Sequence, residues 1–316
     1  MRGGNLQALL GTAVVLVLSW GAAAGAVIIA SGDGTGNTSA PPDDPGWENV
    51  VKLGGLTGVY LGNGWVLTAE HVGARDMFTR GGVRHEWVPD SDVQLVTNGP
   101  DPDADLLLFQ IVRDPGLPDL LIRASPPPQA SEVVMIGLGY NRGNAISACS
   151  RQGWEWGTSK AMRWGTNVVH ENGIDFSISG TLTRIFSTLF DAGHPTLHEA
   201  QAATGDSGGA VFVKNEATSE WELAGIMTAR STLEVCQPSD SALYGNHTYA
   251  GDLSFYLDQI DAITSVPACD DGLDQDGDGL IDYPDDPGCD DALDPFETSD
   301  ALPCDDGIDT DGDGLA

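Results

Sequence analysis

Hydrophobic residues occur in short runs along the middle of the chain, and glycines or polar residues separate one run from the next. Residues 93–96 alternate between apolar and polar side chains, which is the pattern of a strand with one buried face. Many short strands with turn residues between them are typical of an all-β barrel or sandwich. The pattern therefore predicts an all-β fold whose strands include residues 50–53, 58–61, 65–68, 93–96, 133–137 and 221–227.

One later segment has a helical period. Between residues 253 and 263 the apolar residues recur every three or four positions, as they do on the buried face of an amphipathic helix. We expect a helix here, after the strands, with a buried face formed by Leu253, Tyr256, Leu257, Ile260 and Ile263.

The N-terminal end is a targeting segment. Arg2 precedes a long apolar run, and the small residues at 22–24 and 24–26 both fit the site at which a signal peptidase cuts. We interpret residues 1–26 as a secretory signal peptide, with a retained membrane anchor as the alternative. In both cases the protein leaves the cytosol, to be secreted or held at the cell surface or in the periplasm, where disulfides persist.

The negative charge is concentrated at the C-terminal end. The chain has 14 Lys and Arg against 47 Asp and Glu, which gives a net charge of −33. A segment with 18 acidic residues and no basic one begins at Cys269, and its pattern recurs from Cys304 with a period of 35 residues. Phosphate binding needs a basic face, so nucleic acid is not an expected partner. The chain divides into a signal peptide (1–26), an N-terminal linker segment (27–44), a main domain (45–265) and acidic repeats (269–316).

The five cysteines allow two disulfides. Cys149 and Cys236 lie in the main domain and are candidates to pair with each other. Cys269 and Cys289 bracket the first acidic repeat, and we expect them to pair as well. Cys304 is left over. Membrane contact is expected only through the N-terminal segment or through a region beyond this sequence.

The first acidic repeat has the ligand spacing of a calcium loop. Oxygen ligands at loop positions 1, 3, 5, 7, 9 and 12, with glycine at position 6, form the pattern of an EF-hand loop. The repeat also resembles thrombospondin type 3 repeats, which bind calcium and contain disulfides. A disordered acidic spacer is the alternative. The expected ligands of a structural Ca²⁺ are Asp274, Asp276, Asp278, the carbonyl of Leu280, Asp282 and Asp285.

Three short motifs in the main domain contain residues that can act in catalysis. Residues 205–209 read Gly-Asp-Ser-Gly-Gly, a glycine-rich loop that can present the Ser207 hydroxyl and direct backbone N–H groups at an oxyanion. His71 ends the strand-like run Val-Leu-Thr-Ala-Glu. Asp105 directly precedes a buried-looking apolar run, with Asp103 as the less favoured acid. A serine needs a base, and that base needs an orienting acid, so these residues form a candidate catalytic triad.

The order His, Asp, Ser and these motifs resemble the trypsin/chymotrypsin-like serine protease family over about residues 50–263. The resemblance implies two antiparallel six-stranded β-barrels with a C-terminal helix, followed here by an irregular Asp-rich calcium-binding extension. It implies hydrolysis of polypeptide substrates with Ser207 as nucleophile, His71 as base and Asp105 as orienting acid. No catalytic cofactor is expected. The oxyanion hole is expected to consist of the N–H groups of Gly205 and Ser207.

The substrate pocket departs from the family pattern. Gln201 stands where trypsin-like members carry an acid at the pocket floor, and Arg230 stands where a pocket-wall glycine is usual. Thr228 matches the family's serine that supports the buried aspartate. A neutral floor leaves a substrate cation unpaired, so specificity is not expected to be tryptic.

The resemblance to the family also implies how the protease would be activated. In the family a new N-terminal amine pairs with the acid before the serine, which is Asp206 here. A cut after residue 26 would expose Val27, whose amine could pair with Asp206. A catalytically inactive, protease-like adhesion protein with calcium-binding repeats is the alternative function.

Overall fold

The computed structural model describes residues 27–97, 103–233 and 235–298. The predicted signal peptide and the second acidic repeat with Cys304 lie outside the described residues. Among the helices of the described part, none combines the length and the apolar character needed to cross a membrane.

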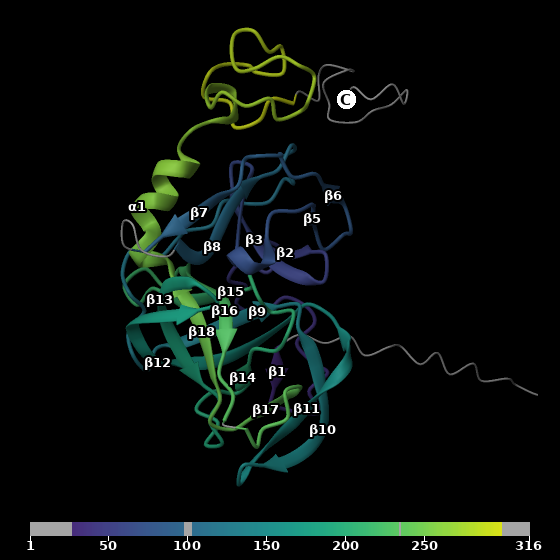
Figure 1. The fold of residues 1–316 in the computed structure, drawn as a ribbon, viewed down its shortest axis with the longest axis vertical. Coiled ribbons are helices and arrows are strands. Elements are labelled where there is room, and N and C mark those ends of the chain that lie inside the picture. Colours follow the sequence, from purple (N-terminus) through teal and green to yellow (C-terminus); the bar gives the residue numbers. More distant parts are fainter. Residues whose placement is uncertain (1–26, 98–102, 234, 299–316) are drawn as a thin grey trace, which may run out of the picture.

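The first half of the main domain is a seven-stranded antiparallel sheet in the order β6–β5–β2–β3–β4–β8–β7 (Figure 1). Its short hydrophobic runs supply strands that bury one or both faces. The strands are β2 (Val50–Leu53), β3 (Leu56–Gly62), β4 (Trp65–Thr68), β5 (Met77–Phe78), β6 (Arg84–His85), β7 (Val93–Val96) and β8 (Asp103–Gln110).

The second half contains a closed six-stranded barrel in the order β12–β13–β18–β16–β15–β9. The all-β class is confirmed, as are the individual strands that the hydrophobic pattern predicted. The first half has a seven-stranded sheet where a six-stranded barrel was expected, and the two-residue strands β5 and β6 lie at one edge of it. The barrel strands are β9 (Glu132–Gly137), β12 (Arg163–Ile178), β13 (Thr181–Leu189), β15 (Ala210–Lys214), β16 (Trp221–Arg230) and β18 (His247–Asp252).

Two smaller sheets flank the barrel. The strand β1 (Ile28–Ile29) pairs with β14 (Ala200–Gln201), just ahead of the serine loop. The hairpin of β10 (Tyr140–Ala148) and β11 (Arg151–Lys160) pairs with β17 (Ser241–Leu243). The hydrophobic pattern did not predict β10 to β13. Many side chains of β10, β11 and β12 are exposed or half-buried, and none of the four strands alternates regularly in burial.

The predicted helix is α1 (Leu253–Thr264), which closes the main domain. The Asp252 carboxylate caps its first turn by accepting a hydrogen bond from the Ser254 N–H at 3.2 Å. Its buried face joins a hydrophobic core that both halves share. That core includes Val59 and Leu106 from the first sheet, Ile136 and Phe212 from the barrel, and Leu253 and Tyr256 from α1.

The Asp-rich tail follows α1 and lies beyond the first sheet (Figure 1). It begins with the 3₁₀ turn η2 (Ala268–Asp270), and the part of it described, up to residue 298, contains no strand. A disulfide joins Cys269 to Cys289, and a second joins Cys149 to Cys236 in the main domain. Both predicted pairings are therefore confirmed.

Candidate active site

His71 and Asp105 meet between two elements of the first sheet. His71 lies in the 3₁₀ turn η1 (Glu70–Val72), which follows β4, and Asp105 lies near the start of β8. The two carboxylate oxygens of Asp105 are 2.8 and 2.9 Å from His71 Nδ1. The His71 N–H also donates to Asp105 Oδ1 at 3.0 Å. The carboxylate thus fixes both the ring and the backbone of the histidine.

Burial sets the electrostatics of this pair. Asp105 is 4% exposed, whereas the His71 side chain is 43% exposed. The hydrogen bond to Asp105 raises the pKa of His71 above its usual range, against the opposing effect of burial. With Nδ1 held by the carboxylate, His71 Nε2 makes no hydrogen bond to any described residue and is available to a substrate or a nucleophile.

The serine loop is held in a conformation that requires glycine. Gly205 has a φ of +108°, which an L side chain rarely adopts. A Cβ on Gly208 would lie 2.0 Å from the Thr57 carbonyl oxygen, so the two backbones approach too closely for any side chain. The Thr57 hydroxyl donates to the Gly205 carbonyl at 2.8 Å, and the Thr57 N–H donates to the Ser207 carbonyl at 3.1 Å. The first sheet therefore positions the loop of the barrel.

These contacts leave the amide N–H groups of Gly205 and Ser207 without a hydrogen-bond acceptor in the described part of the chain. Two unpaired N–H groups on one tight loop form a candidate oxyanion site. Ser207 is partly exposed and lines a cavity of about 130 Å³. His71 and Asp105 line a neighbouring cavity of about 340 Å³. Both cavities are bordered by Thr228, Ala229 and Arg230, so they lie along the same end of β16.

Asp206, next to the serine, points into the core and not toward the two cavities. It is fully buried, and its carboxylate accepts hydrogen bonds from Gly139 N–H at 2.7 Å, Ala203 N–H at 2.8 Å and Val27 N–H at 3.3 Å. Burial raises the pKa of Asp206 to about 6, and these hydrogen bonds oppose the rise. The sequence-based expectation that Val27 reaches Asp206 is met in position, although the two residues are 179 apart along the chain.

The three residues assigned to the substrate pocket occupy different positions. Gln201 is 1% exposed, donates from Nε2 to the His247 carbonyl at 3.2 Å, and lies outside the lining of the Ser207 cavity. Thr228 lines both cavities but makes no hydrogen bond to Asp105 among the described residues. Arg230 borders both cavities, and its Nη2 donates to the Ser239 carbonyl at 2.7 Å.

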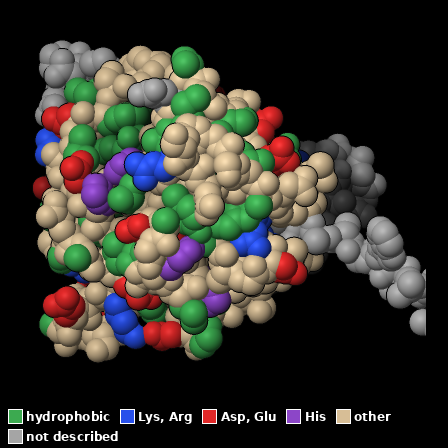
Figure 2. Space-filling view, turned by 90° about the horizontal axis from the view of Figure 1, so that it is seen from below, with side chains coloured by type: hydrophobic (Ala, Val, Ile, Leu, Met, Phe, Trp, Pro, Cys, Tyr) green, Lys and Arg blue, Asp and Glu red, His purple; other side chains and the backbone are tan. Residues whose placement is uncertain are grey.

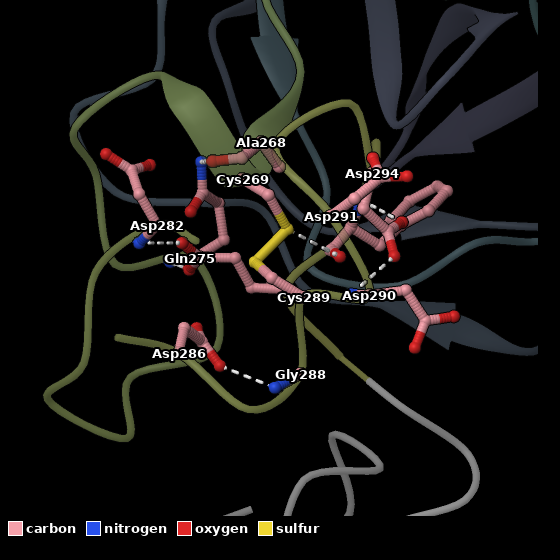
Figure 3. The surroundings of a disulfide bond; sticks show 12 residues. Ala268, Cys269, Gln275, Asp282, Asp286, Gly288, Cys289, Asp290, Asp291 and Asp294 are labelled. Carbon is pink, nitrogen blue, oxygen red and sulfur yellow. Dashed lines mark hydrogen bonds between the residues drawn. A yellow bond between two sulfur atoms is a disulfide. The ribbon is translucent and has the colours of Figure 1, made fainter. Parts of the chain in front are cut away.

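The tail gathers part of the expected calcium ligands. The carboxylates of Asp274, Asp276 and Asp278 lie within 4.8 Å of one another. Asp282 instead accepts N–H groups of Asp271 and Gly272 at 3.1 Å. Its carboxylate points away from Asp286 in Figure 3. Of the expected ligands, Asp282 is therefore engaged with backbone N–H groups and Asp285 is exposed, while Asp274, Asp276 and Asp278 lie together.

Two buried acids that the sequence analysis did not select lie beside this cluster. Asp286 is 1% exposed, and its Oδ1 accepts the Gly288 N–H at 2.7 Å, as Figure 3 shows. Its Oδ2 is buried and has no partner within the described part. Burial raises the pKa of Asp286, and the charges of Asp276, Asp278 and Asp274 add to the rise. Glu297 accepts the Gln275 N–H at 2.6 Å and the Asp282 N–H at 3.0 Å.

Other supporting residues also escaped the sequence analysis. Thr57 holds the serine loop, and the Thr183 hydroxyl accepts a hydrogen bond from the Asp105 N–H at 2.9 Å. Both are threonines within ordinary strands, so no local signal separates them from other strand threonines. For Asp286 the sequence offered one indication of a ligand role, because this residue directly follows Asp285, the expected last calcium ligand.

Comparison with known proteins agrees with this geometry. A family model described as Trypsin matches residues 35–249, which is more than half of the chain and includes His71, Asp105 and Ser207. No curated protein matches the chain. With the all-β architecture and the serine loop in place, the extent of this match shows that the chain belongs to the trypsin family.

Proposed function

We propose that this member of the trypsin family is an exported serine endopeptidase whose catalytic triad is Ser207, His71 and Asp105, with a calcium-stabilised C-terminal extension. The observation that carries the proposal is the buried Asp105 carboxylate 2.8 Å from His71 Nδ1, beside a glycine loop with two unpaired N–H groups. Family membership supports a hydrolase that acts on polypeptides.

In the proposed reaction, Ser207 Oγ attacks the carbonyl carbon of the scissile peptide bond while its proton passes to His71 Nε2. Asp105 keeps the other ring proton on Nδ1 and stabilises the imidazolium that forms. The N–H groups of Gly205 and Ser207 stabilise the negative oxygen of the tetrahedral intermediate. Removing one such donor typically costs about 2.7–4 kcal/mol of transition-state stabilisation.

Collapse of the intermediate breaks the peptide bond, and His71 gives its proton to the leaving amine. The acyl group is then bound to Ser207 as an ester. A water molecule attacks this ester and transfers its proton to His71, and the second product leaves with the carboxylate. Ser207 and His71 return to their starting states, so the cycle consumes only water.

Activation by export fits this geometry. A cut after residue 26 would convert the Val27 N–H into an ammonium group beside the buried Asp206 carboxylate. A buried carboxylate without a partner is costly, whereas a hydrogen-bonded ion pair offsets much of that cost. The pair would hold the adjacent serine loop, so the enzyme would be active once exported. Two disulfides in the described residues are consistent with an oxidising location.

Calcium fits the tail by the chemistry of its donors. Carboxylate oxygens are the ligands that Ca²⁺ prefers. Asp286, whose buried Oδ2 has no partner in the described part, lies near enough to Asp274, Asp276 and Asp278 for their charges to raise its pKa. The residues proposed to hold the ion are Asp274, Asp276, Asp278 and Asp286. Bound Ca²⁺ would neutralise carboxylates that repel one another in a tail with little apolar core.

Labelling with a fluorophosphonate tests the proposal, because this reagent reacts with a serine only when its hydroxyl is activated. We expect one label, on Ser207, and none in Ser207→Ala. Ser147→Ala is the matched control, since Ser147 is exposed on β10, and it should label like the wild type. An unlabelled but folded wild-type protein would favour the inactive, adhesive alternative.

A further inference from the structure

Arg230 occupies a position from which it can contact a substrate. It is the last residue of β16, whose end borders the Ser207 cavity and the His71 cavity. The other residues that line the Ser207 cavity carry no charge: they are Ala202, Ala203, Thr204, Met227, Thr228 and Ala229. Arg230 is therefore the one charged group among the described residues that line this cavity.

The guanidinium of Arg230 is held in place but incompletely paired. Its Nη2 donates to the Ser239 carbonyl at 2.7 Å, and its Cζ lies 4.5 Å from the centre of the Trp156 ring. Its Nη1 is buried and has no hydrogen-bond partner in the described part of the chain. No described carboxylate lies within 4.0 Å of the group. The guanidinium is thus held by two neighbours and has no carboxylate partner among the described residues.

An unpaired cationic N–H that is buried costs free energy, and a carboxylate is the partner that offsets this cost best. Arginine keeps its charge at all ordinary pH values, so the group cannot escape the cost by losing a proton. Burial lowers the pKa of Arg230, and the charge of Asp240 opposes this effect. A negatively charged ligand in the cavity would, like Asp240, raise the pKa of Arg230 and stabilise its charged form.

The residue that the family pattern places at the pocket floor, Gln201, lies outside the lining of this cavity and adds no competing charge. Gln201 is neutral and buried, and its Oε1 has no partner among the described residues. The cavity, at about 130 Å³, is small. These features disfavour a long basic side chain, which would bring a second cation close to Arg230.

We propose that Arg230 is a specificity-determining residue that selects a carboxylate side chain in the Ser207 cavity, so that the enzyme cleaves after Asp or Glu. This inference rests on the proposed protease function and names its substrate class. The substrate carboxylate accepts a charge-assisted hydrogen bond from the Arg230 guanidinium. The competing explanation is that Arg230 only narrows the pocket, in which case small uncharged side chains are preferred.

Fluorogenic peptides that differ only in the residue before the cleaved bond separate these explanations. Glu against Gln and Asp against Asn are compared at 0.15 M salt, because screening then limits the repulsion of acidic peptides by the net charge of −33. We expect the acidic member of each pair to have a kcat/KM higher on the order of 10- to 100-fold. Arg230→Gln should bring the ratios near one, and Arg230→Lys should retain part of the preference.

Arg84→Gln is the matched control, because it removes the same charge from an exposed arginine that pairs with Asp76 and Glu86. It should keep the wild-type ratios. Ratios near one in the wild type, or ratios that survive in Arg230→Gln, would overturn the inference. Fluorophosphonate labelling of Ser207 in the same samples distinguishes that result from failure of the protease function, since the label does not depend on the peptide.

Discussion

At the residue scale, the proposed triad predicts how activity depends on pH through the contact between His71 and Asp105. His71 must be neutral to accept the serine proton, so kcat/KM rises with pH through its pKa. The hydrogen bond to Asp105 raises that pKa, which places the acid limb above pH about 6.5. For stability the sign is opposite: the charged pair stabilises the fold below pH about 6.5, and this contribution is lost as the pH rises through the folded-state pKa.

The first prediction is that Asp105→Asn lowers kcat by about four orders of magnitude and moves the acid limb of the pH profile downward. An amide neither stabilises the imidazolium nor holds the required tautomer. The measurement is kcat/KM against pH for the variant and the wild type. An acid limb at the same pH in both proteins would contradict the role of Asp105.

The second prediction concerns the pair formed by Val27 and Asp206. N-terminal sequencing of active, exported enzyme should begin at Val27. In Asp206→Asn the new amine loses its carboxylate, and breaking such a buried pair costs about 3–5 kcal/mol. We expect loss of most activity with little change in far-UV circular dichroism. A start well downstream, such as Asn49 or Val50, would rule out this activation.

At the scale of elements, β8 connects the candidate site to the tail. It carries Asp105 near its start, and its last residue is Gln110, which is 3% exposed. Gln110 Nε2 donates to Asp271 Oδ2 at 3.1 Å, and its Oε1 accepts from Gln275 Nε2 at 3.4 Å. The tail is therefore anchored to the strand that holds Asp105, the proposed orienting acid.

The third prediction is that Gln110→Ala loosens the tail, because the half-buried Asp271 and the buried Gln275 lose a hydrogen-bond partner at a cost of about 1–3 kcal/mol. Limited proteolysis by an added protease, in a Ser207→Ala background that prevents self-cleavage, should cut after Ala268 faster. Gln152→Ala, an exposed position on β11, is the control. Equal cutting rates in the two variants would show that the anchor is unimportant.

At the scale of the whole molecule, negative charge is distributed unevenly between the main domain and the tail. The face at the barrel end remote from the tail carries scattered Lys, Arg, Asp, Glu and His among hydrophobic side chains (Figure 2). The tail, in contrast, contains 18 of the 47 acidic residues and no basic one. The stability of the tail is therefore expected to depend on a cation more than that of the main domain does.

The fourth prediction is that calcium stabilises the tail with a Kd of about 0.1–1 mM, as in other extracellular modules. At 10 mM calcium this corresponds to about 1.4–2.7 kcal/mol. Protection of residues 268–298 from proteolysis is compared in calcium and in chelator. Asp286→Asn should abolish the protection, whereas Asp285→Asn should retain it. The reverse result would restore Asp285 as the ligand, and no calcium effect in any protein would make the tail a spacer.

The sequence by itself determined the short-range features. A short apolar run bounded by turn residues indicates a buried strand and a period of 3.6 residues indicates a helix, so local patterns sufficed for β2, β9, β16 and α1. The loop at 205–209 could be recognised from the sequence because its backbone conformation requires glycine. Tertiary structure decided the rest: the support of the serine loop by Thr57, the burial of Asp286 beside the acidic cluster, and the position of Arg230 between two cavities. Such contacts depend on how distant segments pack together, and neither period nor composition records that packing.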